Sequence, residues 1–335
     1  MRKLALSLFL TGFMAISSHA DTLRMQENAP DRYVVVKGDT LWDISGRFLK
    51  DPWKWPQIWG MNRDEIKNPH WIYPGDVVVL DRSGATPRLY LRKAEKYGTA
   101  KLSPQVRAEA DAGQGVKAIP ASAVNAFISQ PFVMDEGALN DAPRILSAQE
   151  DRFILGAGDQ AYATSGTTNT GNWKILRPGK ALKDPHTEEI LGYQVEYLGE
   201  ARTVAGGDPQ RILITRSSEE IQRGDKLKPA EDNYSFRYIP HAPAADIEGR
   251  VISAYGGVAE AGQYSTVVLN KGKRDGLDEG TVLAVYKKGN LVDKIQLPDS
   301  RTGLVMIYRV FDKVSYALVM QINRPVNLLD TVRNP

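Results

Sequence analysis

Adjacent carboxylates are the first residues in this 335-residue chain whose type could support catalysis. Glu188-Glu189 and Asp278-Glu279 are pairs of the kind a glycosidase needs, with one carboxyl as general acid and the other as nucleophile or base. Both pairs lie in polar, turn-like stretches, where solvated surface charge is the simpler interpretation. The pairs therefore do not by themselves predict a hydrolase.

Other catalytic chemistries lack their residues. The chain has no cysteine, which excludes papain-like peptidases and L,D-transpeptidases, because both use a Cys nucleophile. A zinc peptidase or amidase would need histidines at HxH or HExxH spacing, and none of His70, His186 and His241 has it. The G-x-S-x-G elbow of a serine acyltransferase is also absent from the sequence. We therefore predict a protein that is not an enzyme and has no cofactor or metal ion.

The elements that position side chains are clearest near the start of the chain. Two β-branched runs, Tyr33–Val36 and Val77–Leu80, alternate as strands do. Between them lie two apolar stripes at helical spacing, which belong to one helix each. They comprise Leu41, Ile44 and Phe48, and then Trp55, Ile58 and Trp59. The pattern predicts a βααβ unit, in which both helices pack on one face of a small sheet.

The fixed positions of this stretch carry a family resemblance. They are Tyr33, Val35, Gly38, Asp39, Thr40, Leu41 and Ile44, then Asn62, then Ile72, Pro74, Gly75, Asp76 and Leu80. Over about fifty residues this order resembles a LysM domain. The stretch departs from the family at 51–56, which lengthens the connection between the helices, and at 68–70, which lengthens the approach to the second strand.

The resemblance implies binding of glycans that contain N-acetylglucosamine, as in peptidoglycan and chitin. The family's shallow groove lies between the loop after the first strand and the loop before the second. Carried onto this chain, the glycan-binding residues are Gly38, Asp39, Thr40, Leu41, Ile72, Tyr73 and Pro74. Backbone groups of these loops would bind the sugar acetamide, and Leu41, Ile72 and Tyr73 would contact its apolar faces.

The same residues also have purely structural interpretations. Asp39 or Thr40 is a good N-cap for the first helix, and Gly38 and Gly75 suit turns that need a positive φ. Residues 74–76 form a type II turn signal without any ligand.

Five of the six tryptophans fall within this unit. Trp55 and Trp59 are spaced i, i+4 and are predicted to be core, since a unit of this size needs large buried side chains. Trp42, Trp53 and Trp71 are candidates for stacking on sugar rings.

The first twenty residues predict a secretory signal peptide. Arg2 and Lys3 precede an apolar stretch that is too short to span a membrane, and residues 18–20 form a small-x-small cleavage site after Ala20. Cleavage leaves 41 basic against 40 acidic residues, a net charge of +1, which gives no strong field for binding nucleic acid or an anionic membrane. We expect an exported, periplasmic protein without nucleic-acid partners or an integral membrane segment in the mature chain.

The remainder of the chain predicts a mainly β region. From Phe153 onward, short alternating runs are separated by Gly-Asp turns, and the pattern of 192–227 is echoed in 303–332. The predicted fold class is α+β, with a βααβ LysM module followed by two related small barrel-like units. The expected divisions are a signal peptide at 1–20, a LysM domain at 31–82, a linker with a short helical segment at 83–145, and β domains at 146–230 and 246–335.

These observations predict a non-catalytic cell-wall protein that recognises N-acetylglucosamine-containing glycan of peptidoglycan. The alternative is an envelope assembly or scaffold protein, in which the LysM module only localises the chain. In that case residues 146–335 bind an envelope protein partner.

Overall fold

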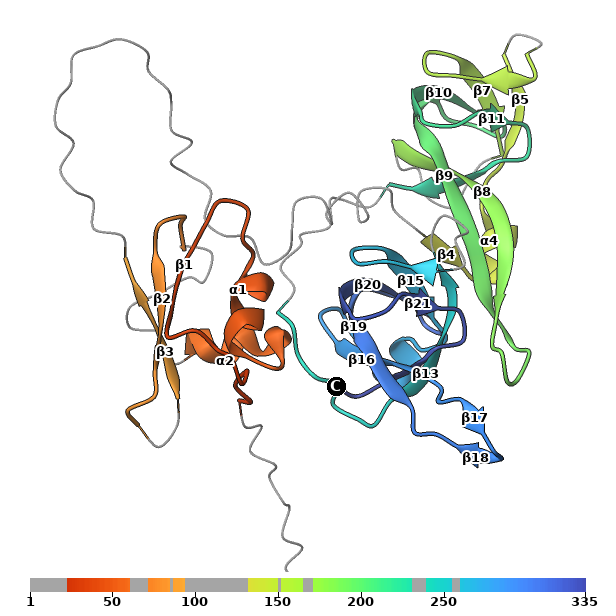
Figure 1. The fold of residues 1–335 in the computed structure, drawn as a ribbon. Helices are drawn as coiled ribbons and strands as arrows, with labels where there is room; N and C mark the ends of the chain where they lie inside the picture. Colours follow the sequence, from red (N-terminus) through yellow and green to blue (C-terminus); the bar gives the residue numbers. More distant parts are fainter. Residues whose placement is uncertain are drawn as a thin grey trace, which may run out of the picture.

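The computed structural model of the protein describes residues 23–60, 72–84, 87–93, 132–149, 152–164, 171–230, 239–254 and 260–335. Three parts follow one another along the chain (Figure 1). The first combines a small sheet with helices, and the second and third are built from strands. The predicted fold class is confirmed.

The N-terminal part has the expected βααβ order, with a third strand added. Its elements are β1 (Arg32–Val34), α1 (Leu41–Phe48), the 3-10 turn η1 (Pro52–Lys54), α2 (Trp55–Gly60), β2 (Val77–Asp81) and β3 (Arg88–Arg92). The antiparallel sheet has the order β1-β2-β3. Because β3 pairs along the whole of β2, the sheet extends beyond the expected module end at Arg82.

Helix α1 is amphipathic as its spacing predicts. Leu41, Ile44 and Phe48 are buried together with Trp55. Thr40 is the N-cap, and its Oγ1 accepts a hydrogen bond from the Asp43 N–H at 3.1 Å. The side chain thereby satisfies one backbone donor at the helix start.

The second part is a seven-stranded sheet with the strand order β12-β8-β9-β10-β7-β5, and β4 pairs with residues 193–195, near the start of β9. Its elements are β4 (Phe132–Met134), α4 (Glu136–Asp141), β5 (Ile145–Ala148), β6 (Ile154–Leu155), β7 (Gln160–Ala163), β8 (Asn172–Lys183), β9 (Ile190–Ala205), β10 (Gln210–Ser217), β11 (Ile221–Gln222) and β12 (Lys226–Pro229).

The third part is a closed barrel with the strand order β13-β15-β20-β19-β16-β22. Its elements are β13 (Glu248–Ala254), β14 (Glu260–Ala261), β15 (Thr266–Leu269), η3 (Lys273–Asp275), β16 (Val282–Lys287), β17 (Leu291–Val292), β18 (Ile295–Gln296), β19 (Ser300–Val310), β20 (Ser315–Ile322), β21 (Val326–Asn327) and β22 (Thr331–Arg333).

The two β units share one topology, as the sequence echo predicts. In the second unit β13 meets β22, where the Val251 N–H donates to the Asp330 carbonyl at 3.0 Å. In the first unit the Ile145 N–H donates to the Asp225 carbonyl at 2.9 Å, so β5 lies beside β12 in the same way. The strands of the two units correspond one to one. Taken from β5, the first unit has the order β5-β7-β10-β9-β8-β12, and the second has the order β13-β15-β20-β19-β16-β22.

Part of the expected linker at 83–145 belongs to these folded units. Strand β4 pairs with β9, and Leu139 of α4 is buried beside Met134 and Val195. The short helical segment of this linker is expected after Pro120, where Ala121, Val124 and Phe127 have helical spacing. It lies outside the described residues. The sequence pattern does not reveal β4 and α4, because each is too short to show a clear hydrophobic period.

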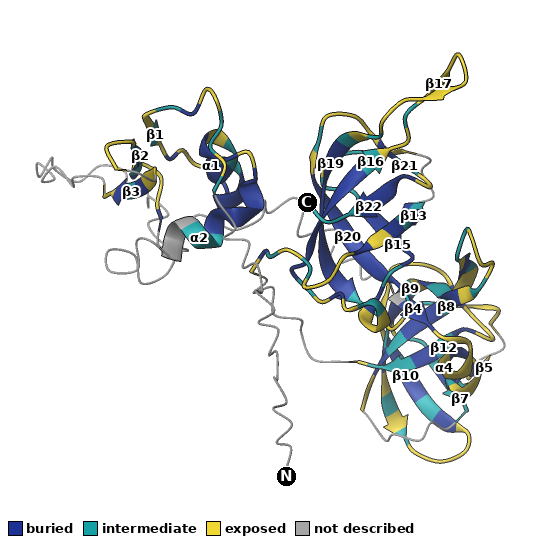
Figure 2. Ribbon diagram, turned by 90° about the horizontal axis from the view of Figure 1, so that it is seen from below, coloured by how far each residue is buried: buried dark blue, intermediate teal, exposed yellow. Residues whose placement is uncertain are grey.

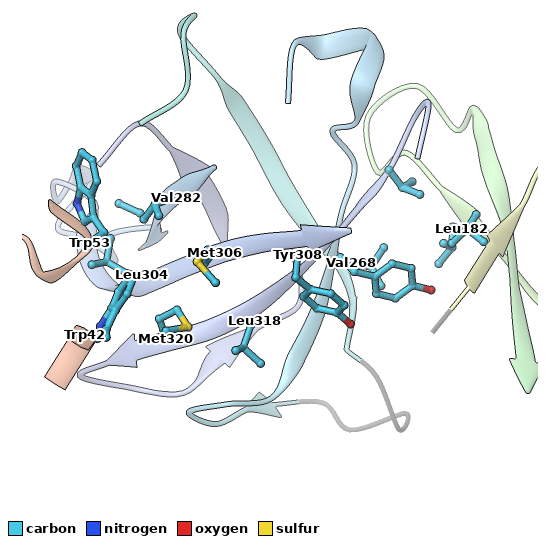
Figure 3. Close-up of a cluster of buried hydrophobic side chains, with 14 of the residues drawn as sticks. Trp42, Trp53, Leu182, Val268, Val282, Leu304, Met306, Tyr308, Leu318 and Met320 are labelled. Atoms are coloured by element: carbon cyan, nitrogen blue, oxygen red, sulfur yellow. The ribbon is translucent and has the colours of Figure 1, made fainter. Parts of the chain in front are cut away.

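Both faces of the barrel strands are apolar. Alternation places Val305, Ile307 and Val319 in the buried cluster that fills the barrel interior, to which all six strands contribute residues. Their neighbours point outward into a second buried cluster, which extends beyond the barrel (Figure 3). That cluster includes Leu304, Met306 and Met320 from the barrel, Trp42 and Trp53 from the N-terminal part, and Leu182 and Leu191 from β8 and β9. The barrel's outer face therefore joins the three parts of the chain.

Polar contacts reinforce the junction between the two β units. Arg274 donates to both oxygens of Glu189, at 3.0 and 3.1 Å, and Lys313 Nζ lies 2.7 Å from Glu189 Oε1. Asn270 donates to Asp184 Oδ2 at 2.8 Å. The turn between β8 and β9 is thus held to the barrel by charge-assisted hydrogen bonds.

Candidate functional site

The loop after β1 is shaped by the Asp39 carboxylate. Asp39 Oδ2 accepts the Val36 N–H at 2.9 Å and the Tyr33 hydroxyl at 2.9 Å. Burial and the hydrogen bond to Asp39 raise the pKa of the Tyr33 phenol. Gly38 has φ +101°, a conformation that costs glycine little. Asp39 therefore holds the loop, while Thr40 takes the N-cap position.

The loop before β2 has a matching arrangement. Asp76 Oδ2 accepts the Tyr73 N–H at 3.0 Å, and the Asp76 N–H donates to the Tyr73 carbonyl at 3.0 Å. Gly75 has φ +98°. Lys93, just after β3, lies 3.2 Å from the Asp76 carboxylate and 5.3 Å from the centroid of the Tyr73 ring. Asp76 is buried, and the ammonium group of Lys93 balances the charge of its carboxylate. The same carboxylate shapes the turn.

Val35 joins the two loops. Its N–H donates to the Asp76 carbonyl at 2.8 Å, and its carbonyl accepts the Gly75 N–H at 2.8 Å. The Val35 side chain is buried in the small core. The two loops that the resemblance identifies are therefore neighbours and are held side by side by backbone hydrogen bonds.

The predicted glycan-binding residues fall into two groups in the structure. Gly38, Tyr73 and Pro74 are exposed, and Asp39 is half-buried. Thr40 is buried as the helix cap.

Leu41 and Ile72 are only 1% and 0% exposed, and both side chains belong to the core with Phe48. The expected apolar contact of these two side chains with a sugar is corrected, because the first helix buries Leu41 and the small core encloses Ile72. Only their backbone groups could reach a ligand.

Among the candidate aromatic residues that the structure describes, Tyr73 keeps an exposed side chain. It is 39% exposed, and Val36 on the neighbouring loop is 53% exposed. Lys93 lies against the Tyr73 ring and was not among the expected site residues. The alternation of 88–92 could have revealed it, since a third strand beside β2 ends next to this loop.

The tryptophans are placed differently from the stacking hypothesis. Trp42 and Trp53 are 4% and 5% exposed, and they belong to the buried cluster that includes Leu304 and Met320 of the barrel (Figure 3). Such burial leaves almost no ring surface for a sugar. Trp55 is buried in the small core as expected. The Trp71 hypothesis, like the side chain of Trp59, lies outside what the structure describes.

A shallow surface depression lies on the β2–β3 hairpin. It is lined by Val79, Leu80, Asp81, Tyr90, Leu91 and Arg92. Val79, Leu80 and Asp81 lie on the part of β2 away from Tyr73, whereas Leu91 and Arg92 pair with Val78 and Val77 and lie nearer the loop before β2.

The residues considered for catalysis are engaged in structural contacts. Glu189 binds Arg274 and Lys313, which together hold the pKa of that carboxyl at about 2. Asp278 accepts from Thr281 and lies 2.9 Å from His241 Nε2. His70 lies outside the described ranges.

The part of the chain that the structure describes has neither a metal-ligand cluster nor a membrane-spanning helix. Within it, no three His, Cys, Asp or Glu side chains are grouped so as to hold a metal ion. Within the same ranges, no helix has the length and apolar character needed to cross a membrane.

Comparison with known proteins identifies the N-terminal part. Residues 33–81 match the LysM domain family, so this segment is a LysM domain. LysM domains bind N-acetylglucosamine-containing glycans such as those of peptidoglycan, and they are binding modules without catalytic chemistry.

A similar relative is "Uncharacterized protein YqbP" of Bacillus subtilis (strain 168), with 44% identity over 66 residues. The matched segment spans 17% of this chain and 30% of that relative. The similarity therefore concerns a small part of either protein.

Proposed function

We propose that the protein is a non-catalytic cell-wall protein, which binds N-acetylglucosamine-containing glycan of peptidoglycan at the two loops joined by Val35. The observation that carries the proposal is the LysM match over residues 33–81. It is supported by the adjacency of Gly38 and Tyr73, whose loops are held together by the Val35 hydrogen bonds.

The chemistry of the loops suits an acetamido sugar. Backbone groups of two adjacent turns can pair with the acetamide N–H and C=O. The exposed ring of Tyr73 and the side chain of Val36 offer an apolar surface to the acetyl methyl and the ring C–H groups. Contact would be through Gly38, Asp39, Tyr73 and Pro74, with Leu41 and Ile72 supporting the loops from the core.

A single shallow groove of this kind binds weakly. We expect a Kd of about 10 µM to 1 mM for a short glycan. Retention on the wall would then depend on the repetitive polymer or on a second contact elsewhere in the chain.

Export belongs to the same proposal. Residues 1–20 would direct the chain out of the cytoplasm, with cleavage after Ala20 and residence in the periplasm. N-terminal sequencing of the protein from its native cells should begin at Asp21, whereas a retained Met1 would contradict export by this route.

The test of glycan binding is cosedimentation of the full chain with purified sacculi. Wild-type protein should pellet, and Tyr73→Ala should lower the affinity by about tenfold, or about 1.4 kcal/mol. Phe153→Ala is the matched control, since Phe153 is 94% exposed in the first β unit. Equal binding by Tyr73→Ala and wild type would remove the proposed site.

The same incubation tests the absence of catalysis. Soluble muropeptides should not accumulate when sacculi are incubated with the protein. Their release at a rate that scales with protein concentration would show a hydrolase.

A further inference from the structure

The hairpin β17–β18 projects from the C-terminal barrel and is exposed (Figure 2). Most of its strand residues are nevertheless apolar. Leu291 and Ile295 are each 67% exposed, Val292 is 49% exposed and Leu297 is 43% exposed. Hairpins in water normally carry polar residues at such positions, and exposed apolar clusters mark interaction sites.

Apolar side chains occupy both faces of this hairpin. Val292 pairs with Ile295, so these two side chains share a face, and alternation places Leu297 with them. Leu291 pairs with Gln296 and therefore lies on the opposite face. A flat partner could cover only one of these faces.

A second exposed apolar loop lies at the base of the hairpin. Leu328 and Leu329 are 45% and 58% exposed and lie just before β22. Strand β22 pairs with β16, with Thr331 opposite Tyr286 near the end of β16 from which the hairpin continues. The two loops therefore share one end of the barrel.

Leu329 in this second loop has a backbone conformation that is unfavourable for leucine. Leu329 has φ +69°, and the equivalent position in the first β unit is Gly224 with φ +95°. The equivalence rests on the following aspartates: Asp225 and Asp330 each accept the backbone N–H three residues earlier, at 2.7 and 2.9 Å. Glycine adopts this conformation without strain, whereas leucine is strained in it. Because the Leu329 side chain is exposed, burial in a core does not offset that strain.

Basic side chains accompany the apolar hairpin, with Lys287 and Lys288 at its base and Lys294 at its turn. Lys287, Lys288 and Lys294 are exposed in or beside the hairpin, against Asp293 at its turn. Asp299, at the hairpin's other end, is paired with Arg333 at 3.1 Å. The local balance is therefore basic although the whole chain is close to neutral.

We propose that this end of the barrel docks on an anionic phospholipid surface. Leu291, Ile295 and Leu329 enter the boundary between head groups and acyl chains, while the lysines bind lipid phosphates. A lipid surface surrounds a projecting hairpin on all sides, which suits apolar groups on both of its faces. The alternative partner for this surface is a protein with a groove lined by acidic residues, and the experiment must distinguish it from a lipid surface.

The experiment is cosedimentation of the full chain with vesicles of phosphatidylethanolamine and phosphatidylglycerol, compared with vesicles of phosphatidylcholine alone. Wild-type protein should bind the anionic vesicles, and added salt should weaken this binding because exposed charges are screened. The double variant Leu291→Asp/Ile295→Asp should lose at least about tenfold in partitioning. Lys288→Gln/Lys294→Gln should lose roughly fivefold for each lysine on anionic vesicles only.

Phe153→Asp is the matched control, because it places the same charge at an exposed aromatic far from the hairpin in sequence. It should bind the vesicles as wild type does. Each variant should also keep wild-type sacculus binding and thermal unfolding, which shows that the fold is intact. Failure of wild type to bind anionic vesicles, equal binding to both vesicle types, or undiminished binding by the aspartate variant would each overturn the proposal.

Discussion

The Asp76 carboxylate accepts the backbone N–H of Tyr73 at 3.0 Å, three residues before it in the chain. The same bond recurs between Asp225 and Gln222 and between Asp330 and Asn327. Of these three turns, the one in the LysM domain carries an exposed aromatic ring. A common turn, which elsewhere closes a β unit, here orients the residue that we place at the glycan.

Replacing Asp76 with alanine should disorder this turn and weaken both the fold and the binding of sacculi. The substitution removes the acceptor for the Tyr73 N–H and the charge partner of Lys93. We expect a loss of about 1–3 kcal/mol in the free energy of unfolding, measured by chemical denaturation. Asp76→Asn keeps an acceptor oxygen and should be milder; equal stability of the alanine variant and wild type would contradict the role of the carboxylate.

Leu41→Asp should unfold the LysM domain rather than only weaken binding. Leu41 is 1% exposed and belongs to the small core, where a carboxylate has no partner. The expected cost exceeds about 3 kcal/mol. Loss of the helical signal from this part of the chain, followed by hydrogen exchange of residues 41–48, would confirm it. A folded variant that had only lost glycan binding would return Leu41 to the groove.

Trp42→Ala should separate the LysM domain from the barrel while leaving glycan binding within about twofold of wild type. The ring is buried in the cluster that contains barrel residues Leu304 and Met306. Small-angle scattering should report a larger radius of gyration. Weaker sacculus binding with an unchanged radius would instead mean that the ring contacts sugar.

Acid should weaken the junction between the two β units. Arg274 and then Lys313 hold the pKa of Glu189 at about 2, below its ordinary value of 4.5. Because the folded-state pKa is depressed, this stabilisation is present above about pH 4.5 and is lost as the pH falls toward 2. Thermal unfolding of wild type and Glu189→Gln, compared between pH 6 and about pH 2.5, should show a difference that shrinks with acid. A difference that is constant with pH would contradict it.

Much of the fold could be predicted from the sequence because the decisive patterns are local. The stripe of Leu41, Ile44 and Phe48 gave α1, and the Gly-Asp turns gave the repeated β units. Strand β3 was missed, since five alternating residues give a weak signal until pairing with β2 buries Leu89 and Leu91.

The site was harder to predict because exposure depends on contacts that are distant in sequence. Nothing near Trp42 in the chain shows that a strand more than 250 residues later covers it. Leu41 and Ile72 have types that suit either core or groove, and only packing distinguishes the two. The protein partner proposed for residues 146–335 stays a prediction.

The most direct test of the central claim is an NMR titration of isotopically labelled full-length protein with an N-acetylglucosamine oligomer. The account predicts that amide shifts change first at Gly38, Asp39, Tyr73 and Gly75, the residues of the two loops that Val35 joins. Shift changes confined to Leu80, Asp81 and Tyr90, on the part of the β2–β3 depression away from Tyr73, or no changes at millimolar sugar, would contradict it.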